Sequence, residues 1–248
     1  MSPRLFAFAA GLALSAAAAQ AETLAFSVGV GAQMQQDYFG SADDSVGPTG
    51  SFSPRYLRLG SVEIGDPDPN AVSLGFHPRG SFRFIGERTA DDNAELAGLE
   101  DIDLSVELGG GVGFRSTGFQ AFADLRYGVV GHESVVAEVG ADAIARPVRD
   151  VTVTLGPRVL WGSEDFVETY FGVTPAEAGA SSFPAYDAGS GLVSAGLEAN
   201  ITYDFNTDWA VRGTATWDRF LGDAGDSPIV ADEDAFGLSV QVIRSFAF

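Results

Sequence analysis

Few side chains in this sequence have the chemistry of a nucleophile or a general base. The chain of 248 residues contains two histidines and no cysteine, which excludes thiolate chemistry and disulfide bonds. His132 and Ser134 are two residues apart, so on a β-strand the imidazole and the hydroxyl lie on the same face. This is the spacing that a serine activated by a neighbouring base requires. The other histidine, His77, stands beside Pro78 and is interpreted as a turn residue.

The His-x-Ser pair resembles the site of outer-membrane lipid A deacylases, in which the pair lies on a barrel strand and a distal glutamate completes the site. In the strand expected at 134–146, Glu138 and Asp142 share the parity of this pair. His132 and Ser134 are therefore expected on the polar face of that strand, pointing away from lipid. We predict no catalytic residues and retain a lipid A-modifying hydrolase only as a remote alternative.

Acidic residues gather between the apolar runs, where they are candidate ligands for divalent cations. None of these groups has the Asp-x-Asp-x-Asp-Gly spacing of a calcium loop, so the sequence predicts neither a metal site nor a cofactor. Whether the acidic loops bind divalent cations is left open. The glycine run at 109–113 lies inside a predicted strand with no helix after it, which excludes a phosphate loop; it relieves crowding on the inner wall or curves the sheet. The acidic groups are Asp43-Asp44, Asp91-Asp92, Glu164-Asp165 and Asp232-Glu233-Asp234.

The charge balance is strongly acidic, with 34 Asp and Glu against 14 basic residues, all of them Arg. No basic stripe is available to neutralise phosphates, so nucleic acid is not an expected partner. Hydrophobic residues make up 46% of the chain, which also holds 31 Gly and 19 Phe, and this composition favours a folded sheet over disorder. A large soluble β-sandwich is the alternative, but it requires strand after strand to be wet on its outer face.

Residues 1–21 have the layout of a secretory signal peptide. Arg4 supplies the positive charge, an apolar run extends from Leu5 to Leu14, and Ala19-Gln20-Ala21 is a small-residue cleavage site. The apolar run is shorter than the ~20 residues that a membrane helix needs. We therefore expect a mature domain of residues 22–248. No segment of that domain is apolar enough for a membrane helix, so membrane insertion requires a barrel.

The clearest structural pattern is the stretch 101–130, where apolar residues alternate with polar residues or glycine. This alternation predicts two β-strands, and the joint Ser116-Thr117-Gly118 predicts a tight hairpin in which Gly118 takes a positive φ. Both runs are about twice the average length of strands in soluble sheets. Long strands with one apolar face are typical of membrane-spanning strands. We therefore predict an all-β fold, a closed antiparallel transmembrane β-barrel.

Similar alternation elsewhere gives ten strands, or twelve if the region 59–77 supplies another hairpin. Region 59–86 is the least clear, because the stretches 66–70 and His77-Pro78-Arg79-Gly80 are turn sequences. Pro48 and Pro54 weaken the strand expected at 48–58. The remaining strands are expected at 24–34, 134–146, 151–161, 191–205, 209–220 and 235–248.

From residue 87 onward the connections between these strands largely alternate in length, and the short connection at Gly131 is the exception on the long-loop side. Those after residues 114, 146 and 205 are short, and those after 86, 161 and 220 are long and polar. Outer-membrane barrels have short periplasmic turns and long external loops. This rule assigns both termini to the periplasm and every long connection to the outside.

The two faces of the predicted strands differ as a membrane barrel requires. Arg244 is a misfit, because it falls on the apolar face of the last strand, where we expect its guanidinium to snorkel. Aromatic residues form two expected girdles, the outer of Tyr127, Trp161 and Trp217 and the inner of Phe114, Phe119, Tyr203, Phe205, Trp209, Phe246 and Phe248. The interior face holds carboxylates and guanidinia suited to ion pairs: Asp103, Glu107, Asp124, Arg126, Glu138, Asp142, Arg146, Arg158, Glu198, Asp204, Arg212 and Asp218.

Four loop sequences and the aromatic C-terminus give the chain a family resemblance. The loop sequences are Tyr38-Phe39-Gly40-Ser41, Leu96 to Asp101, Tyr170-Phe171-Gly172-Val173 and Gly222 to Val230. With these motifs the mature chain resembles the MipA/OmpV family. The resemblance implies an outer-membrane barrel, and the best-known member is a scaffold that bridges a lytic murein transglycosylase and a bifunctional murein synthase. No catalytic, cofactor-binding or metal-binding residue is carried over from the family.

The sequence as a whole predicts a non-enzymatic outer-membrane scaffold or structural protein that interacts with murein-synthesis and murein-hydrolysis enzymes. The alternative is a small porin-like channel for cationic solutes, because ten to twelve strands lie between filled barrels of about eight strands and wide pores of about sixteen. Further expected partners are lipopolysaccharide and the barrel-assembly machinery, the latter through the C-terminal Phe248. The identity of the protein partner and the oligomeric state are left open.

Overall fold

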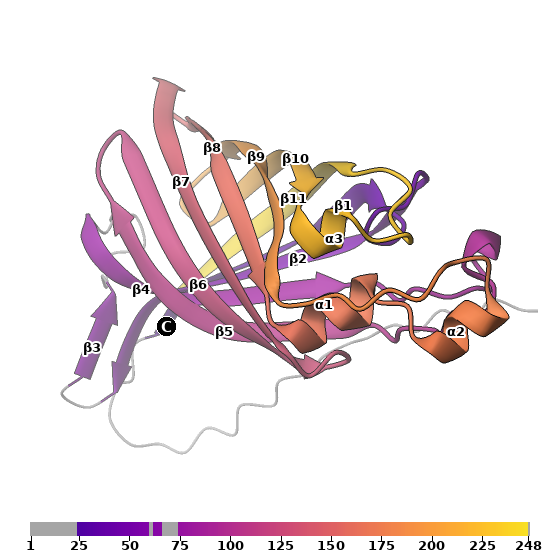
Figure 1. Ribbon diagram of the computed structural model, residues 1–248. Coiled ribbons are helices and arrows are strands. Elements are labelled where there is room, and N and C mark those ends of the chain that lie inside the picture. The colour runs from indigo at the N-terminus through magenta and orange to yellow at the C-terminus, as the bar shows by residue number, and fades with distance from the viewer. Residues whose placement is uncertain (1–23, 60–61, 66–73, 248) are drawn as a thin grey trace, which may run out of the picture.

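The computed structural model describes residues 24–59, 62–65 and 74–247. Within these residues the chain forms one sheet of eleven strands in the order β3-β2-β1-β11-β10-β9-β8-β7-β6-β5-β4 (Figure 1). The expected signal peptide at 1–21, the stretch 66–70 and the terminal Phe248 lie outside the described residues. The strands are β1 Leu24–Gln36, β2 Asp44–Leu59, β3 Val62–Gly65, β4 Gly75–Ile85, β5 Ser105–Arg115, β6 Phe119–Val130, β7 Val135–Val148, β8 Val151–Gly162, β9 Gly191–Asp204, β10 Trp209–Phe220 and β11 Asp234–Ala247.

All ladders of this sheet are antiparallel. From β4 to β11 each strand pairs with the next, and β1 pairs with both β2 and β11, so the two ends of the described chain lie in adjacent strands. Among the described strands, ten are 11 to 16 residues long and β3 has four residues. This agrees with the lower of the two predicted strand counts, and β3 is a short extra strand in the region that the sequence left unclear.

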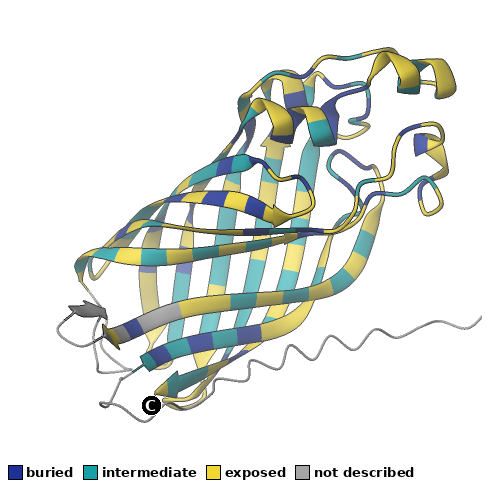
Figure 2. Ribbon diagram, turned by 90° about the horizontal axis from the view of Figure 1, so that it is seen from below, coloured by how far each residue is buried: buried dark blue, intermediate teal, exposed yellow. Residues whose placement is uncertain are grey.

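The sheet curls into a barrel-shaped wall (Figure 2). Its terminal strands are β4 and β3, and β3 is paired with β2. Strand β4 lies beside β2, but no ladder joins the two among the described residues. The predicted all-β antiparallel architecture is confirmed, whereas closure of the wall at this β2–β4 seam stays a prediction.

The burial pattern of the sheet is the reverse of that in a soluble protein. Large apolar side chains of the strands face outward, and Val240, in the middle of β11, is 59% exposed. Polar side chains face inward, and the carboxylates of Glu107 and Asp142 are fully buried. Figure 2 shows exposed and partly buried residues alternating along the strands. Because an apolar surface this extensive is unfavourable in water, the pattern is that of a sheet whose outer face contacts lipid.

Aromatic side chains mark the two rims of this apolar face. Five of the outward aromatic residues predicted for the girdles are exposed at the rim formed by the short hairpins. At this rim Phe76 also packs on Phe114, with ring centroids 5.1 Å apart. Arg244 belongs to that rim as well, since its guanidinium carbon lies 5.1 Å from the Trp209 ring and 4.8 Å from the Phe246 ring. Stacking at the rim explains how this arginine is accommodated on the apolar face. The five exposed girdle residues at this rim are Phe114, Phe119, Tyr203, Phe205 and Trp209.

Glycine in β5 allows its backbone to lie close to the neighbouring strand. A Cβ atom on Gly109 would collide with the backbone of Leu125 and Arg126 in the neighbouring strand β6. The missing side chains therefore allow β5 and its neighbours to pack closely, which agrees with the predicted relief of crowding, whereas the predicted role in curving the sheet stays a prediction.

Several local predictions are wrong. Strand β5 begins at Ser105 rather than near 101, because Ile102 pairs instead with Arg88 in an isolated bridge of the preceding loop. Strand β2 begins at Asp44 rather than at residue 48, because its first residues continue the ladder with β1. Gly118 does not adopt a left-handed φ, since the hairpin closes through the bond from Ser116 N to Phe119 O.

The sequence His77-Pro78-Arg79-Gly80 is not a turn, as it lies inside β4 and pairs with residues 110–113 of β5. The glycines of β5 provide the reason. A Cβ on Gly113 would meet the His77 ring and the side chain of Arg79, so the missing side chain makes room for both. Strand pairing has overridden the local turn preference of the proline.

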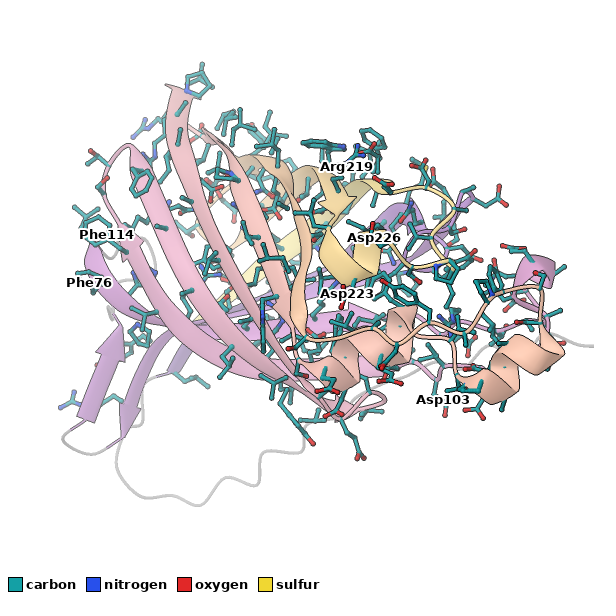
Figure 3. The ribbon with its side chains drawn as sticks, in the orientation of Figure 1. Phe76, Asp103, Phe114, Arg219, Asp223 and Asp226 are labelled. Carbon is teal, nitrogen blue, oxygen red and sulfur yellow. The ribbon has the colours of Figure 1, made fainter. Side chains whose placement is uncertain are left out.

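Helices occur in the long connections: η1 Ala94–Leu96, α1 Glu164–Phe171, α2 Pro175–Ala180 and α3 Gly222–Gly225. None of the helices in the described part of the chain has the length and apolar character needed to cross a membrane. In Figure 3, Asp103, Asp223 and Asp226 of the long connections lie at the end of the molecule opposite Phe76 and Phe114. The long connections thus lie at one end of the barrel wall and the short hairpins at the other, as predicted.

Candidate functional site

Four long connections, 37–43, 86–104, 163–190 and 221–233, fold against one another to form what we call the cap (Figure 1). Its centre is α1, in which apolar residues recur at helical spacing and turn one face toward the sheet. Phe39 from the first connection stacks on Phe171 with centroids 5.8 Å apart. The buried α1 residues Phe166, Val167, Tyr170 and Phe171 form a core with Ile85, Val136, Ala188, Val193, Phe220 and Ala224.

A second buried cluster joins the four connections farther from the sheet. It consists of Tyr38, Leu96, Leu99, Val173 and Ile229. Each of the four loop sequences that carry the family resemblance supplies at least one of these residues. The resemblance therefore coincides with the residues that pack the cap.

Polar contacts tie the cap together and hold it on the sheet. Ser227 Oγ donates to the Phe171 carbonyl at 2.6 Å, and Tyr170 OH donates to Ser105 Oγ at 2.9 Å. Arg88 Nη1 donates to the Tyr170 carbonyl at 2.9 Å. These contacts are buried, so breaking any of them would leave an unpaired polar group inside the protein.

The α2 helix is fixed by a capping box. Glu177 N donates to Thr174 Oγ1, and the Glu177 carboxylate accepts from Thr174 N at 2.9 Å and from Glu100 N at 2.9 Å. Burial acts to raise the pKa of Glu177, but the hydrogen bonds from Glu100 and Thr174 outweigh it and hold the pKa below its usual value. In the same part of the cap, burial and the neighbouring Glu95 raise the pKa of Tyr38 to about 12.

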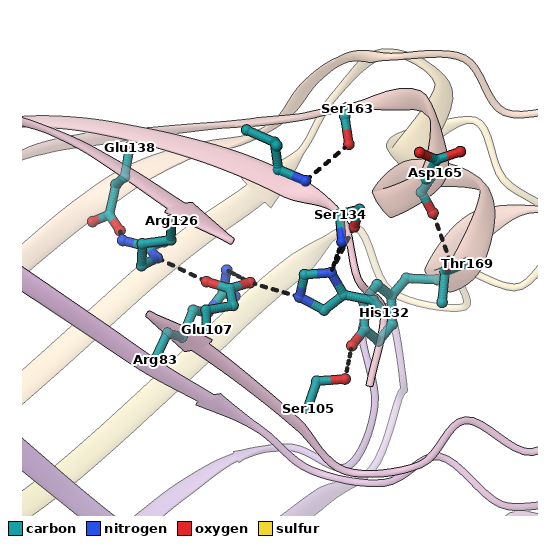
Figure 4. Close-up of polar contacts among 12 residues, drawn as sticks. Arg83, Ser105, Glu107, Arg126, His132, Ser134, Glu138, Ser163, Asp165 and Thr169 are labelled. Atoms are coloured by element: carbon teal, nitrogen blue, oxygen red, sulfur yellow. Dashed lines mark hydrogen bonds and ion pairs between the residues drawn. The ribbon is translucent and has the colours of Figure 1, made fainter. Parts of the chain in front are cut away.

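Beneath the cap, Glu107 of β5 is the centre of a buried charge network (Figure 4). Arg126 Nε donates to Glu107 Oε2 at 2.7 Å, and Arg126 Nη1 donates to Glu138 Oε2 at 2.8 Å. Arg83 Nη1 lies 3.9 Å from Glu107 Oε1. The Glu107 and Arg126 side chains are 0% and 4% exposed, so each charge depends on the other for compensation.

His132 and Ser134 lie against this network, under α1. The Ser134 N–H donates to His132 Nδ1 at 3.2 Å, which makes Nδ1 an acceptor, and Ser134 Oγ is 2.5 Å from the same atom. His132 Nε2 faces Glu107 Oε1 at 3.3 Å. The order of groups matches a serine–histidine–carboxylate relay, with Glu107 as the distal glutamate that the sequence did not assign. However, Ser134 is 2% exposed and the imidazole packs edge-on against Phe166, so protein encloses the hydroxyl and the pair does not face lipid.

A second set of ion pairs spans the wall between β4 and β9. Arg158 donates to Asp142 at 2.8 Å and to Glu198 at 2.9 Å. Arg79 donates to Asp124 at 3.1 Å, and its guanidinium stands 4.2 Å from the ring of Phe122. Arg158 approaches the same ring from 5.2 Å. Carboxylates, guanidinia and one aromatic ring thus line the interior in paired form.

Most of the predicted interior residues lie where the sequence placed them. Three do not: Asp103 is exposed in the cap, and Arg146 and Asp204 are exposed near the short hairpins. Arg79 and Arg83 were missed because β4 was interpreted in part as a turn, although Arg79, Ser81 and Arg83 have the parity of an inward face. In the described chain no three His, Asp or Glu side chains converge as a metal site. The predicted interior residues that form described ion pairs are Glu107, Asp124, Arg126, Glu138, Asp142, Arg158 and Glu198, and their partners include Arg79 and Arg83, which were not predicted.

Comparison with known proteins adds the following. A family model described as "MltA-interacting protein MipA" matches residues 28–246. Proteins named MltA-interacting protein from Escherichia coli strain K12 and from Shigella flexneri are each 39% identical over 80 residues, which is 32% of this chain and 32% of either relative. The match thus spans about a third of their length. The outer membrane channel DcaP of Acinetobacter baumannii has a TM-score of 0.37 at 10% identity, covering 90% of this chain and 96% of that one, a likeness too low to support an inference.

Proposed function

The chain belongs to the MltA-interacting protein MipA family, and from this premise we propose that it is a non-enzymatic scaffold of the cell envelope that engages murein-synthesis and murein-hydrolysis enzymes. The protein is an outer-membrane β-barrel protein with an apolar outer face and a charged inner one. Its named relatives are MltA-interacting proteins. The family resemblance makes a lytic murein transglycosylase and a murein synthase the expected enzymes.

The observation that carries this proposal is the packing of the cap. The sequences that mark the family build two buried clusters at one end of the sheet, and ion pairs occupy the interior below them. A rigid body of this kind suits a protein that holds partners in place. We further propose that the wall is closed at the β2–β4 seam, because an open sheet edge in hydrocarbon leaves backbone groups unpaired.

The short hairpins are the natural docking end. With the cap outside the cell, connections 116–118, 149–150 and 205–208 face the periplasm, where murein lies. Two of these hairpins are tied together, since Arg146 Nη1 donates to the Thr117 carbonyl at 2.8 Å. An enzyme of the periplasm would meet this end of the barrel.

Site-specific photocross-linking in intact cells tests the proposal. We expect a photoreactive residue at Thr117, Arg149 or Thr207 to capture a murein transglycosylase or synthase. The same residue at Asp91 or Gly179, both exposed in the cap, is the matched control and should capture neither. Capture of these enzymes from the cap positions alone, or from none of the five, would contradict the scaffold.

The alternative is the small channel for cationic solutes, which the charged interior favours. Planar-bilayer recordings separate the two functions. Conductance steps that vanish when the long connections are trimmed support a channel, whereas a silent protein that captures murein enzymes supports a scaffold. The remote hydrolase is rejected if Ser134→Ala leaves the lipid A profile of the host unchanged.

Two expectations concern how the protein reaches the membrane. We propose that residues 1–21 are removed as a signal peptide and that the barrel-assembly machinery recognises the C-terminal Phe248. Deletion of Phe248 should leave the protein in the periplasm, measured by membrane fractionation. Normal outer-membrane levels of the truncated chain would refute this. Lipopolysaccharide is the expected lipid neighbour of the outer rim.

A further inference from the structure

A cavity of about 460 Å³ lies in the cap, between the second connection, the β6–β7 loop and the α1–α2 segment. Its lining is polar and strongly charged, and it includes two side chains that are more than nine-tenths buried, Arg88 and His132. The remaining charged residues of the lining are Glu100, Asp101, Asp103, Glu133, Glu168 and Glu177.

The walls of this cavity are held in place by contacts that leave some groups occupied and others free. Glu177 is occupied by the capping box and by Glu100 N, and Asp101 Oδ1 accepts from Ala90 N at 3.0 Å. The backbones of Arg88 and Ile102 are bonded in both directions, at 2.8 and 2.9 Å. The cavity is therefore formed before any ligand arrives, which lowers the entropic cost of binding.

Arg88 supplies the positive charge in the wall. It is 5% exposed, and although Glu177 and Asp101 attract its charge from a distance, no carboxylate of the described residues lies within ion-pair distance of it. Its Nη1 is bonded to the Tyr170 carbonyl, but its Nε is buried without a hydrogen-bond partner. Buried guanidinia are normally paired, and a carboxylate matches their geometry best. The other buried side chain, His132, is already directed at Glu107 and Ser134.

Four carboxylates of the lining are free. The side chains of Glu100, Asp103, Glu133 and Glu168 are exposed and make no hydrogen bond or ion pair within the described residues. Together they create a negative potential at the mouth of the cavity, which attracts ammonium groups.

The charges of the cavity disfavour ligands that carry charge of a single sign, namely metal ions, polyamines and simple anions. The carboxylates do not converge as a metal site among the described residues, and the buried guanidinium opposes a metal ion or a polyamine. A simple anion is repelled by the acidic mouth before it reaches Arg88. A molecule with both charges satisfies the wall and the mouth together.

We propose that this cavity binds a small zwitterion, an amino acid or short peptide with free termini, whose carboxylate pairs with Arg88 and whose ammonium group lies among Glu100, Asp103, Glu133 and Glu168. The bound ligand would contact both the connection 86–104, through Arg88, and α1, through Glu168. The proposal does not depend on the scaffold function.

Calorimetry on the protein purified in detergent tests the site, with alanine, alanyl-alanine and alanyl-alanyl-alanine as probes. We expect at least one to bind, and the preferred length distinguishes an amino acid from a peptide end. Acetylating the amine of that probe, or converting its carboxylate to the amide, should each weaken binding at least tenfold. The amide probe tests Arg88 without altering the fold of the cap.

Variants locate the site. Glu168→Gln should weaken binding about threefold or more, and Glu164→Gln, an exposed position of the same helix outside the cavity, should leave it unchanged. Equal binding of the amide and the free acid would overturn the proposal, and so would tighter binding of spermidine or Mg²⁺ than of any zwitterion. No binding of the three probes would overturn it as well.

Discussion

Among single residues, the buried charges of the interior are the most sensitive to substitution. In Arg126→Met, Glu107 loses its closest partner while it remains enclosed, and a buried charge left unpaired costs about 3–5 kcal/mol. We expect that loss of stability in urea unfolding of the detergent-solubilised protein. Arg219→Met is the matched control, because Arg219 is 48% exposed beside Glu233 and Asp234, and exposed pairs contribute about 1 kcal/mol or less. Equal losses in the two variants would contradict the buried network.

Contact of the apolar outer face with hydrocarbon can be tested at Val240 and Arg244. Val240→Arg places a charge at mid-strand on that face, which costs about 2–4 kcal/mol in hydrocarbon. In Arg244→Leu, the stack on Trp209 and Phe246 is lost, at about 0.5–1 kcal/mol, while a charge leaves the apolar face, so the net change should be small. Folding into lipid vesicles measures both. If Val240→Arg leaves the free energy of folding unchanged, this face does not contact hydrocarbon.

The sequence predicted which residues face the interior but not which of them pair. Parity alone placed Glu107, Arg126 and Asp142 on one face, since alternation has a period of two. Pairing depends on register, which long-range ladders decide: Asp124 stands opposite another acid, Glu138, across β6 and β7, so it pairs instead with Arg79 of β4. The free and occupied carboxylates of the cavity were unpredictable for the same reason, because the cap brings distant loops together.

Among the elements, the glycines of β5 make a sharp test of curvature. Gly109→Ala places a methyl group into the backbone of β6, and overpacking of this kind costs about 1–3 kcal/mol. Gly118→Ala is the matched control, since a Cβ there meets nothing within 4 Å and the residue has no left-handed φ. We expect slower or incomplete folding into vesicles for the first variant alone, and equal folding of both would remove the curvature argument.

The capping box of α2 predicts a dependence on pH. The folded pKa of Glu177 lies below the ordinary glutamate value of 4.5, so its contribution to cap stability is complete above that value. The contribution is lost as the pH falls through the lower, folded pKa. Hydrogen exchange of the Glu100 amide, which donates to this carboxylate, should therefore gain an acid-dependent opening that Glu177→Gln abolishes. An identical pH profile in both proteins would contradict the assignment.

Long strands were predictable because alternation repeats over many residues, but the helices of the cap were missed. The signals were present: Phe166, Tyr170 and Phe171 have helical spacing, and Thr174 stands three residues before Glu177 with Pro175 between them. Each helix is shorter than two and a half turns, so it is stable only through packing on the other connections. Because the helices are short and the connection 163–190 is rich in polar residues, the sequence of this connection resembles a loop.

In the whole molecule, unpaired negative charge gathers on the cap, whereas the charges of the interior are largely paired. The four connections of the cap contain one basic residue, Arg88, among many carboxylates, while arginines of β4, β6 and β8 pair with acids inside the wall. The excess negative charge of the chain therefore lies largely on the cap. A strongly acidic surface attracts cationic groups and repels anions, which agrees with the ligand class proposed for the cavity.

Closure of the wall is the property on which membrane insertion depends. Every backbone group within hydrocarbon must be paired, so β2 and β4 should lie about 5 Å apart along the seam in the membrane. The chain has no cysteine, which allows Ser51→Cys in β2 and Ser81→Cys in β4 to be cross-linked on a clean background. A short bis-maleimide, which alkylates one thiol at each end, should join this pair within one chain in isolated outer membranes. Ser51→Cys with Thr154→Cys of β8, on a strand far from β2 in the sheet order, should not be joined. Cross-links between chains at the first pair would show instead that the two edges pair with neighbouring copies.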